Sequence, residues 1–283
     1  MTKSKEKKAL VIQGGALRSV FTAGVLDAFL VSKYNPFDLY IAVSSGAMCL
    51  AYYLSEQYKE VHDIMLELSE DSEFMSAYNA LSEEGYMNLS YLKEYSQKTH
   101  PLHIAKAMGA VEAKKSYFVA TNLESGEPVY LQPNHENYLK CLLATSTLPF
   151  VTKGKCEIDG VQLMDGGWSD PIPAKTAVDM GATELVMIRT VPIDYKLEWS
   201  YLGWAASYWH ASNEGMSKRF ANEESYYNES VDYLLENPDG VDIVQIAPDQ
   251  HLSSGGYVNQ KEHLIRDYRN GLEKGLDYLR KYA

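Results

Sequence analysis

The sequence predicts an α/β protein with a mostly parallel sheet, and three observations support this. Short apolar runs at Ala9–Ile12 and Phe37–Val43 have the length of buried strands. Each run is followed by a segment with helical spacing of apolar residues, one after Gly14-Gly15 and one over Gly46–Glu56. This strand–helix–strand–helix order is how parallel sheets are built, because a crossover helix returns the chain to the start of the next strand.

The remaining chain predicts more elements of the same two kinds. The helix after the glycines is expected to be amphipathic and about four turns long, with an apolar face that includes Val20, Phe21, Val25, Leu26 and Phe29. The later expected elements are a polar helical stretch over Glu60–Lys98 with an irregular cap or insertion at Asp71–Gly85, a strand pair at Ser116–Ala120 and Pro128–Leu131, a buried helix at Tyr138–Thr145, buried strands at Glu184–Val191 and Val241–Ile246, and a closing helix at Glu262–Tyr282.

Length and composition indicate one folded unit. The 283 residues are 46% hydrophobic and contain no linker-like stretch, so we expect a single domain over 1–283 with a helical C-terminal extension, 195–283, packed on it. No apolar run reaches the length of a membrane span, and Met1–Lys8 is lysine-rich without a following hydrophobic signal region. Three scattered cysteines, Cys49, Cys141 and Cys156, lack metal-ligand spacing and favour a reduced, cytoplasmic protein.

Charge narrows the range of partners. The formal net charge of −12 argues against nucleic acid and against steady attraction to anionic membranes. Brief apolar contact with a membrane or with micellar substrate stays open. The sequence carries no indication of oligomeric state.

The most informative segment is Leu39–Ala47, an apolar strand that leads directly into a turn of small residues with Ser44 at its tip. This is the layout of a nucleophile elbow, in which a sharp strand-to-helix turn presents a serine hydroxyl above the sheet. The residues two before and two after the nucleophile must be small because the backbones nearly touch there. Ala42 and Gly46 occupy those positions, and an ordinary β–α loop is the alternative interpretation.

A second segment, Gln13–Ser19, lies between a strand and a helix and contains Gly14 and Gly15. Successive backbone amides at a helix N-terminus suit an anion, which in acyl transfer is the oxyanion of the tetrahedral intermediate. A nucleotide-phosphate loop is disfavoured, because the segment lacks a Gly-Lys-Ser/Thr ending and a G-x-G-x-x-G pattern. A structural turn without function stays open.

A third segment, Leu163–Trp168, ends an apolar strand with Asp165, followed by two glycines. Such an aspartate can act as a general base if its carboxylate reaches the serine hydroxyl. Taken alone, Asp-Gly is more typical of an ordinary turn.

Together the three segments resemble the patatin-like phospholipases, a family of lipid acyl hydrolases with plant and bacterial members. Leu10–Asp27 is similar to the family's glycine-rich segment and helix, and Phe37–Ala47 to its strand and elbow. Ala144–Gly167 resembles its Ala-Ser-x-x-(Leu/Ile)-Pro … Ile-Asp-Gly … Asp-Gly-Gly stretch. The resemblance implies a three-layer α/β/α sandwich.

The same resemblance implies a Ser–Asp dyad without histidine, with Ser44 as nucleophile and Asp165 as base. Asp165 would take the Ser44 proton, the oxygen would attack an ester carbonyl, and water activated by the carboxylate would release the acyl group. An ordinary aspartate is a weak base, so burial is expected to raise its pKa. No metal or organic cofactor is needed. The other implied site residues are Gly14, Gly15 and Ala16 for the oxyanion hole and Arg18, Ser45 and Trp168 for substrate binding.

Three positions, Ala16, Ser19 and Ala42, depart from the glycines usual in the family. Serine esterases generally tolerate alanine at the position of Ala42. Ala16 can still donate its amide to the oxyanion if its φ is negative. A positive φ there would cost about 1 kcal/mol and impair catalysis. A noncatalytic lipid-binding or regulatory protein therefore stays open, as does a small-ester or thioester hydrolase.

Two further features carry alternatives. A Ser–His–Asp triad remains possible through His210, His251 or His263, which follow Asp165 in the chain. The aromatic run Trp199–Trp209 is typical of a packed helix or a dimer contact, but it could also line or cover an acyl-chain pocket.

Overall fold

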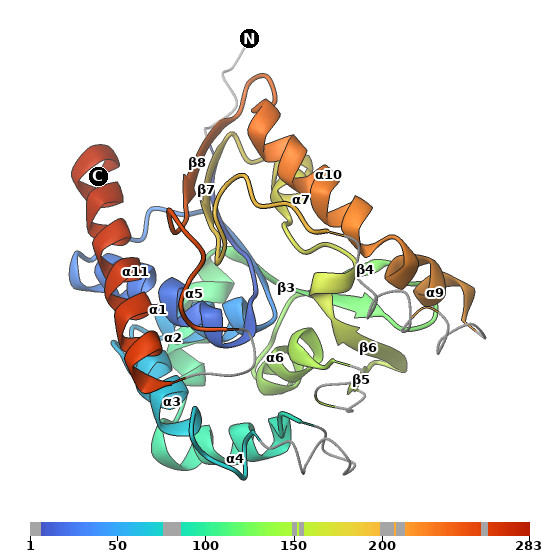
Figure 1. Ribbon diagram of the computed structural model, residues 1–283, viewed down its shortest axis with the longest axis horizontal. Coiled ribbons are helices and arrows are strands. Elements are labelled where there is room, and N and C mark those ends of the chain that lie inside the picture. The colour runs from blue at the N-terminus through green and yellow to red at the C-terminus, as the bar shows by residue number, and fades with distance from the viewer. Residues whose placement is uncertain are drawn as a thin grey trace.

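The computed structural model describes residues 7–75, 86–148, 152, 156–198, 207, 213–255 and 260–283. Its described strands form one eight-stranded sheet, and helices cover both faces (Figure 1). The strand order is β5-β6-β3-β2-β1-β7-β8, with β4 paired to β3 off this path. The strands are β1 (Lys8–Ile12), β2 (Leu39–Val43), β3 (Lys115–Asn122), β4 (Pro128–Leu131), β5 (Cys156–Ile158), β6 (Val161–Asp165), β7 (Glu184–Ile188) and β8 (Asp242–Ile246).

The sheet combines a parallel part with an antiparallel part. β1, β2, β3, β7 and β8 run parallel, whereas β4, β5 and β6 are antiparallel to their neighbours. Val43 at the end of β2 pairs with Val119 of β3, and the next residue, Ala120, pairs with Asp165 of β6. Ser44, the residue after β2, and Asp165, the last residue of β6, are therefore brought near each other across β3.

The strands are apolar on both faces, and alternate residues serve two cores, as expected for a sheet covered on both sides. One face carries Leu10 and Ile12, and the other carries Ala9 and Val11. This gives the mixed α/β, three-layer fold that the sequence predicts. The helices are α1 (Val20–Val31), α2 (Ser45–Leu54), α3 (Glu60–Leu68), α4 (Leu89–Thr99), α5 (Ile104–Ala113) and α6 (Tyr138–Ser146) with the first core, and α7 (Ala174–Asp179), α9 (Glu214–Ala221), α10 (Glu223–Glu236) and α11 (Lys261–Tyr282) from the C-terminal half.

α1 departs from the amphipathic pattern expected for it, because almost all of its length is buried. The reason is α11, which packs along α1. Both helices cover the face of the sheet that is opposite to α7 and α10 (Figure 1). Glycines let the two backbones touch: a Cβ on Gly271 would lie 2.0 Å from the Phe21 carbonyl oxygen, and one on Gly24 would lie 2.2 Å from that of Tyr268. The prediction of a solvent-facing side of α1 was wrong, since a distant segment covers it.

Two strand predictions had different outcomes. The strand pair predicted at Ser116–Ala120 and Pro128–Leu131 is confirmed, since β3 and β4 pair antiparallel. The strand predicted over Val241–Ile246 is confirmed as β8, but the prediction that it is buried was wrong, because β8 is an edge strand whose residues are mostly half-exposed. Apart from Ser207, the aromatic run Trp199–Trp209 lies outside the described residues, and so does most of the expected cap. No helix in the described ranges is long and apolar enough to cross a membrane.

Candidate active site

Ser44 lies at the turn between β2 and α2 with φ 54° and ψ −133°, a conformation that residues other than glycine rarely adopt. Such strain costs on the order of 1–3 kcal/mol and is concentrated at functional sites. The Ser44 amide donates to Thr145 Oγ1 at 2.8 Å, and Thr145 Oγ1 in turn donates to the Val119 carbonyl. The strained turn is therefore anchored to α6 and β3.

The small residues around the turn are required by close packing. A Cβ on Gly46 would lie 2.8 Å from both the Gln13 carbonyl oxygen and Ile12 Cγ2. Ala42, one of the three departures from the family pattern, is fully buried in β2, where it pairs with Ile12 of β1 and Phe118 of β3.

Asp165 ends β6 with its side chain buried, 4% exposed. The Gly167 amide donates to its carboxylate at 2.7 Å. Burial raises the pKa of Asp165 to about 6, and hydrogen bonds from the Ser44 side chain and the Gly167 amide partly oppose that rise. Gly166 permits this arrangement, because a Cβ there would lie 2.2 Å from the Val119 carbonyl oxygen. Ser44 and Asp165 are 121 residues apart in sequence, yet the Ser44 side chain lies close enough to lower the pKa of the Asp165 carboxyl.

The glycine-rich loop after β1 lies against Ser44. A Cβ on Gly14 would lie 2.9 Å from Ser44 Cβ, and the Gly15 amide donates to Ser45 Oγ at 3.2 Å. Among the described residues the Gly14 and Ala16 amides have no hydrogen-bond acceptor. Free amides beside a nucleophile are what an oxyanion hole requires.

The other two departures have different consequences. Ser19 is fully buried, and its hydroxyl lies 2.7 Å from Ser45 Oγ, so it supports the turn rather than crowding it. Ala16 has φ 50°, the strained case considered from the sequence. Its backbone therefore carries about 1 kcal/mol of strain that glycine would not have.

The predicted substrate-binding residues are not all at one place. Ser45 lines the same cavity as Ser44. Arg18 Nε donates to the Gly15 carbonyl at 3.4 Å, and the described ranges hold no ion pair of its guanidinium. Trp168 packs edge-on against Phe220 of α9, with ring centroids 4.5 Å apart, and does not line the cavity. The substrate role expected for Trp168 gains no support from this position.

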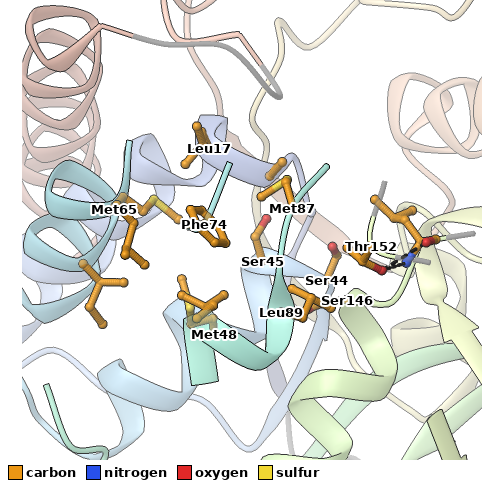
Figure 2. Close-up of a pocket in the computed structure, with 15 residues that line it drawn as sticks. Leu17, Ser44, Ser45, Met48, Met65, Phe74, Met87, Leu89, Ser146 and Thr152 are labelled. Carbon is orange, nitrogen blue, oxygen red and sulfur yellow. Dashed lines mark hydrogen bonds between the residues drawn. The ribbon is translucent and has the colours of Figure 1, made fainter. Parts of the chain in front are cut away.

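An apolar cavity of about 70 Å³ opens beside Ser44. In Figure 2, Ser44, Ser146 and Thr152 lie on one side of it and Met65 and Phe74 on the other. A second apolar cavity of about 80 Å³ extends between α2, α4 and α6. The two cavities share the side chains of Met48, Leu89, Leu92 and Ser146.

No histidine of the described chain lines the cavity beside Ser44. His251 is exposed and stacks edge-on against Tyr195, and His263 lies on α11; His210 is outside the described residues. The described residues also contain no group of three or more His, Cys, Asp or Glu side chains that could hold a metal ion.

Sequence reasoning missed Thr145 and Thr190. Thr145 stands within the stretch matched to the family's Ala-Ser-x-x-(Leu/Ile)-Pro pattern, so the pattern itself was the available signal. Thr190 follows β7, and its hydroxyl donates to the Gly14 carbonyl at 2.8 Å. Its signal was weaker: a polar residue at the carboxyl end of a parallel strand, where sites in such sheets are found.

Comparisons with known proteins show which family the chain belongs to. The family model "Patatin-like phospholipase" matches residues 10–178, and the model "Domain of unknown function (DUF6363)" matches residues 214–283. The chain is 30% identical over 271 residues to the Escherichia coli K12 protein described as "Uncharacterized protein YjjU", covering 93% of this chain and 74% of that protein. The crystal structure of VipD from Legionella pneumophila is similar at a TM-score of 0.47 and 13% identity, over 99% of this chain and 68% of that one. The chain belongs to the patatin-like phospholipase family.

Proposed function

We propose that the protein is a serine acyl hydrolase that cleaves carboxylic esters of lipids through Ser44 and Asp165. One observation carries the proposal: a serine in a strained turn lies beside a buried carboxylate, and burial raises the pKa of that carboxylate to about 6. A base with that pKa is largely ionised at neutral pH and yet basic enough to accept a proton in the transition state.

The proposed reaction has two halves. Asp165 accepts the Ser44 proton while Oγ bonds to the ester carbonyl carbon, and the carbonyl oxygen becomes an oxyanion. The intermediate collapses, and the alcohol leaves with the proton from Asp165. Water then gives a proton to Asp165 and attacks the acyl-enzyme, and Ser44 recovers its proton as the fatty acid departs.

In this proposal the amides of Gly14, Gly15 and Ala16 stabilise the oxyanion. Two of them are free of other acceptors in the described residues, and the third donates to Ser45 Oγ, a group that substrate can displace. Removing one such donor from an enzyme typically costs about 100- to 1,000-fold in kcat. Arg18 lies next to this loop and is proposed to attract an anionic part of the substrate.

The lipid class rests on the cavity beside Ser44. Its lining is dominated by methionine, leucine and phenylalanine side chains, which favour an acyl chain over a polar group. Met48, with its flexible thioether, lies where the two cavities adjoin, so a long chain is proposed to pass from the first cavity into the second. Brief contact with a membrane or micelle would deliver such a substrate. The three buried, free cysteines support a reducing compartment such as the cytoplasm.

Ala16 favours a second candidate, a protein of this fold with little or no activity. Its φ of 50° strains the loop at a proposed oxyanion donor. The two candidates differ in one property, the reactivity of Ser44.

A fluorophosphonate probe tests that property directly. We expect wild type to be labelled, Ser44→Ala to be unlabelled, and Ser225→Ala, at an exposed serine on α10, to be labelled as wild type. Wild type should also hydrolyse p-nitrophenyl butyrate. Absence of both labelling and hydrolysis in a folded wild-type protein would overturn the hydrolase proposal and leave the noncatalytic candidate.

A further inference from the structure

A largely buried series of hydrogen bonds connects the glycine-rich loop to α10. Gln13 Nε2 donates to the Tyr227 hydroxyl at 3.0 Å, and Gln13 Oε1 accepts from the Thr190 amide at 3.3 Å. Thr190 Oγ1 then donates to the Gly14 carbonyl at 2.8 Å. These hydrogen bonds connect the residues after β1 and β7 and end at Tyr227 of α10, which lies 214 residues after Gln13.

Thr190 sets the orientation of one peptide group. The carbonyl of Gly14 and the amide of Gly15 belong to the same trans peptide and point in opposite directions. Thr190 holds the carbonyl on one side, and Ser45 Oγ accepts from the amide on the other at 3.2 Å. Gly15 has to be glycine here, because a Cβ would lie 2.6 Å from Thr190 Oγ1.

The Tyr227 hydroxyl oxygen accepts a second hydrogen bond, from the buried Arg189. Arg189 is fully buried, and its Nη2 donates to the Tyr227 hydroxyl at 3.2 Å, while Nη1 donates to the Ile193 carbonyl at 2.6 Å. In the described part of the chain no carboxylate pairs with this guanidinium, and its Nε has no acceptor. The Tyr227 oxygen is therefore one of the few groups that stabilise a buried charge. It also ties the residue after β1 to the residue after β7.

We propose that Thr190 and Tyr227 are positioning residues that hold the Gly14–Gly15 peptide in the orientation an oxyanion hole needs. Tyr227 belongs to the segment that matches a domain of unknown function, so this segment acquires a role: its α10 completes the support of the active-site loop. The inference rests on the proposed hydrolase function. Its physical basis is preorganisation, because a donor that must reorient during the reaction stabilises the oxyanion less.

Thr190 offers a matched pair of variants. Thr190→Val keeps the shape but removes the hydroxyl, whereas Thr190→Ser keeps the hydroxyl. On p-nitrophenyl butyrate we expect Thr190→Val to lower kcat about 10- to 100-fold with KM nearly unchanged, which is the size of effect known for misplaced site groups. Thr190→Ser should stay within about threefold of wild type, and the rate of fluorophosphonate labelling should follow kcat.

Tyr227→Phe tests the link to α10, with Tyr226→Phe as its control on the same helix. Tyr226 is half-exposed, and its ring stacks on Arg219. We expect Tyr227→Phe to lower kcat at least tenfold in protein that is still folded at the assay temperature, and Tyr226→Phe to behave as wild type. If Tyr227→Phe does not fold, the comparison of kcat between Thr190→Val and Thr190→Ser tests the positioning role.

The outcomes separate this inference from the function on which it rests. A wild type without hydrolysis or labelling refutes the hydrolase proposal itself. An active wild type with normal kcat in both Thr190→Val and Tyr227→Phe refutes only the positioning role. A loss that Thr190→Ser shares with Thr190→Val, or one that appears in KM alone, also refutes it.

Discussion

The Gly167 amide donates a 2.7 Å hydrogen bond to the carboxylate of Asp165, two residues before it in the chain. The Asp-Gly-Gly sequence thus holds its own acidic side chain in place, while the Ser44 side chain approaches the same carboxylate from β2. These two donors do not compensate for burial, and the pKa of Asp165 stays raised, at about 6. Both the pH dependence of activity and the cost of the site in stability follow from this balance.

Activity should depend on a single ionisation near pH 6. The proposed base must be charged, so kcat/KM on p-nitrophenyl butyrate should fall about tenfold per pH unit below pH 6 and level off above pH 7. Asp165→Asn should be inactive across the range. A flat profile between pH 5 and pH 8 would show that another group is the base.

Asp165→Asn should make the protein more stable at neutral pH. The folded-state pKa of about 6 lies above the unfolded value near 4, so the folded state binds the extra proton between these pH values. Stability is therefore lost as pH rises from about 4 to 6, by up to roughly 3 kcal/mol, and stays reduced above pH 6. Asparagine removes the buried charge.

Urea unfolding at two pH values checks this expectation. The gain from Asp165→Asn should reach about 2–3 kcal/mol at pH 8 and nearly disappear at pH 4. Asp179→Asn is the control, because Asp179 is exposed on α7, in a surface pair with Lys175 worth less than about 1 kcal/mol. An equal gain at both pH values would contradict the ionisation argument.

The sequence was sufficient where the structure is local. The elbow, the strand before it and the helix after it lie within Leu39–Leu54, so apolar runs and small residues predict them directly. The Ser44–Asp165 contact was predictable only through the family resemblance, since nothing in the chain's spacing brings positions 44 and 165 together.

The features that could not be predicted from the sequence depend on contacts between segments that are far apart in the chain. The second buried face of α1 requires α11, whose closest glycine contact, Gly271 to Phe21, spans most of the chain. The Gln13–Tyr227 hydrogen bond is equally distant. The half-exposed β8 was predicted to be buried, because an apolar run does not reveal whether a neighbouring strand pairs on both sides.

A bulky side chain in the second cavity should shorten the acyl chains that the protein accepts. Leu142 of α6 lines that cavity away from Ser44, so Leu142→Trp fills space without touching the proposed dyad. We expect kcat/KM to fall about tenfold on p-nitrophenyl palmitate and to change little on p-nitrophenyl butyrate. Leu235→Trp, at an exposed leucine on α10, should alter neither. Equal losses on both esters, or none on either, would exclude the second cavity from the acyl path.

Gly271→Ala should destabilise the protein although alanine is the better helix former. A Cβ at this position of α11 would lie 2.0 Å from the Phe21 carbonyl oxygen, so α1 and α11 must separate. Overpacking of this kind costs about 1–3 kcal/mol, and backbone rather than a flexible side chain has to move here. Gly109→Ala on α5 is the opposite case, because nothing lies within 4 Å of the added Cβ. Helix propensity should then stabilise the protein by about 0.5–1 kcal/mol. Urea unfolding of the two variants should therefore give shifts of opposite sign, and a stabilising Gly271→Ala would mean that the α1–α11 contact is looser than this packing implies.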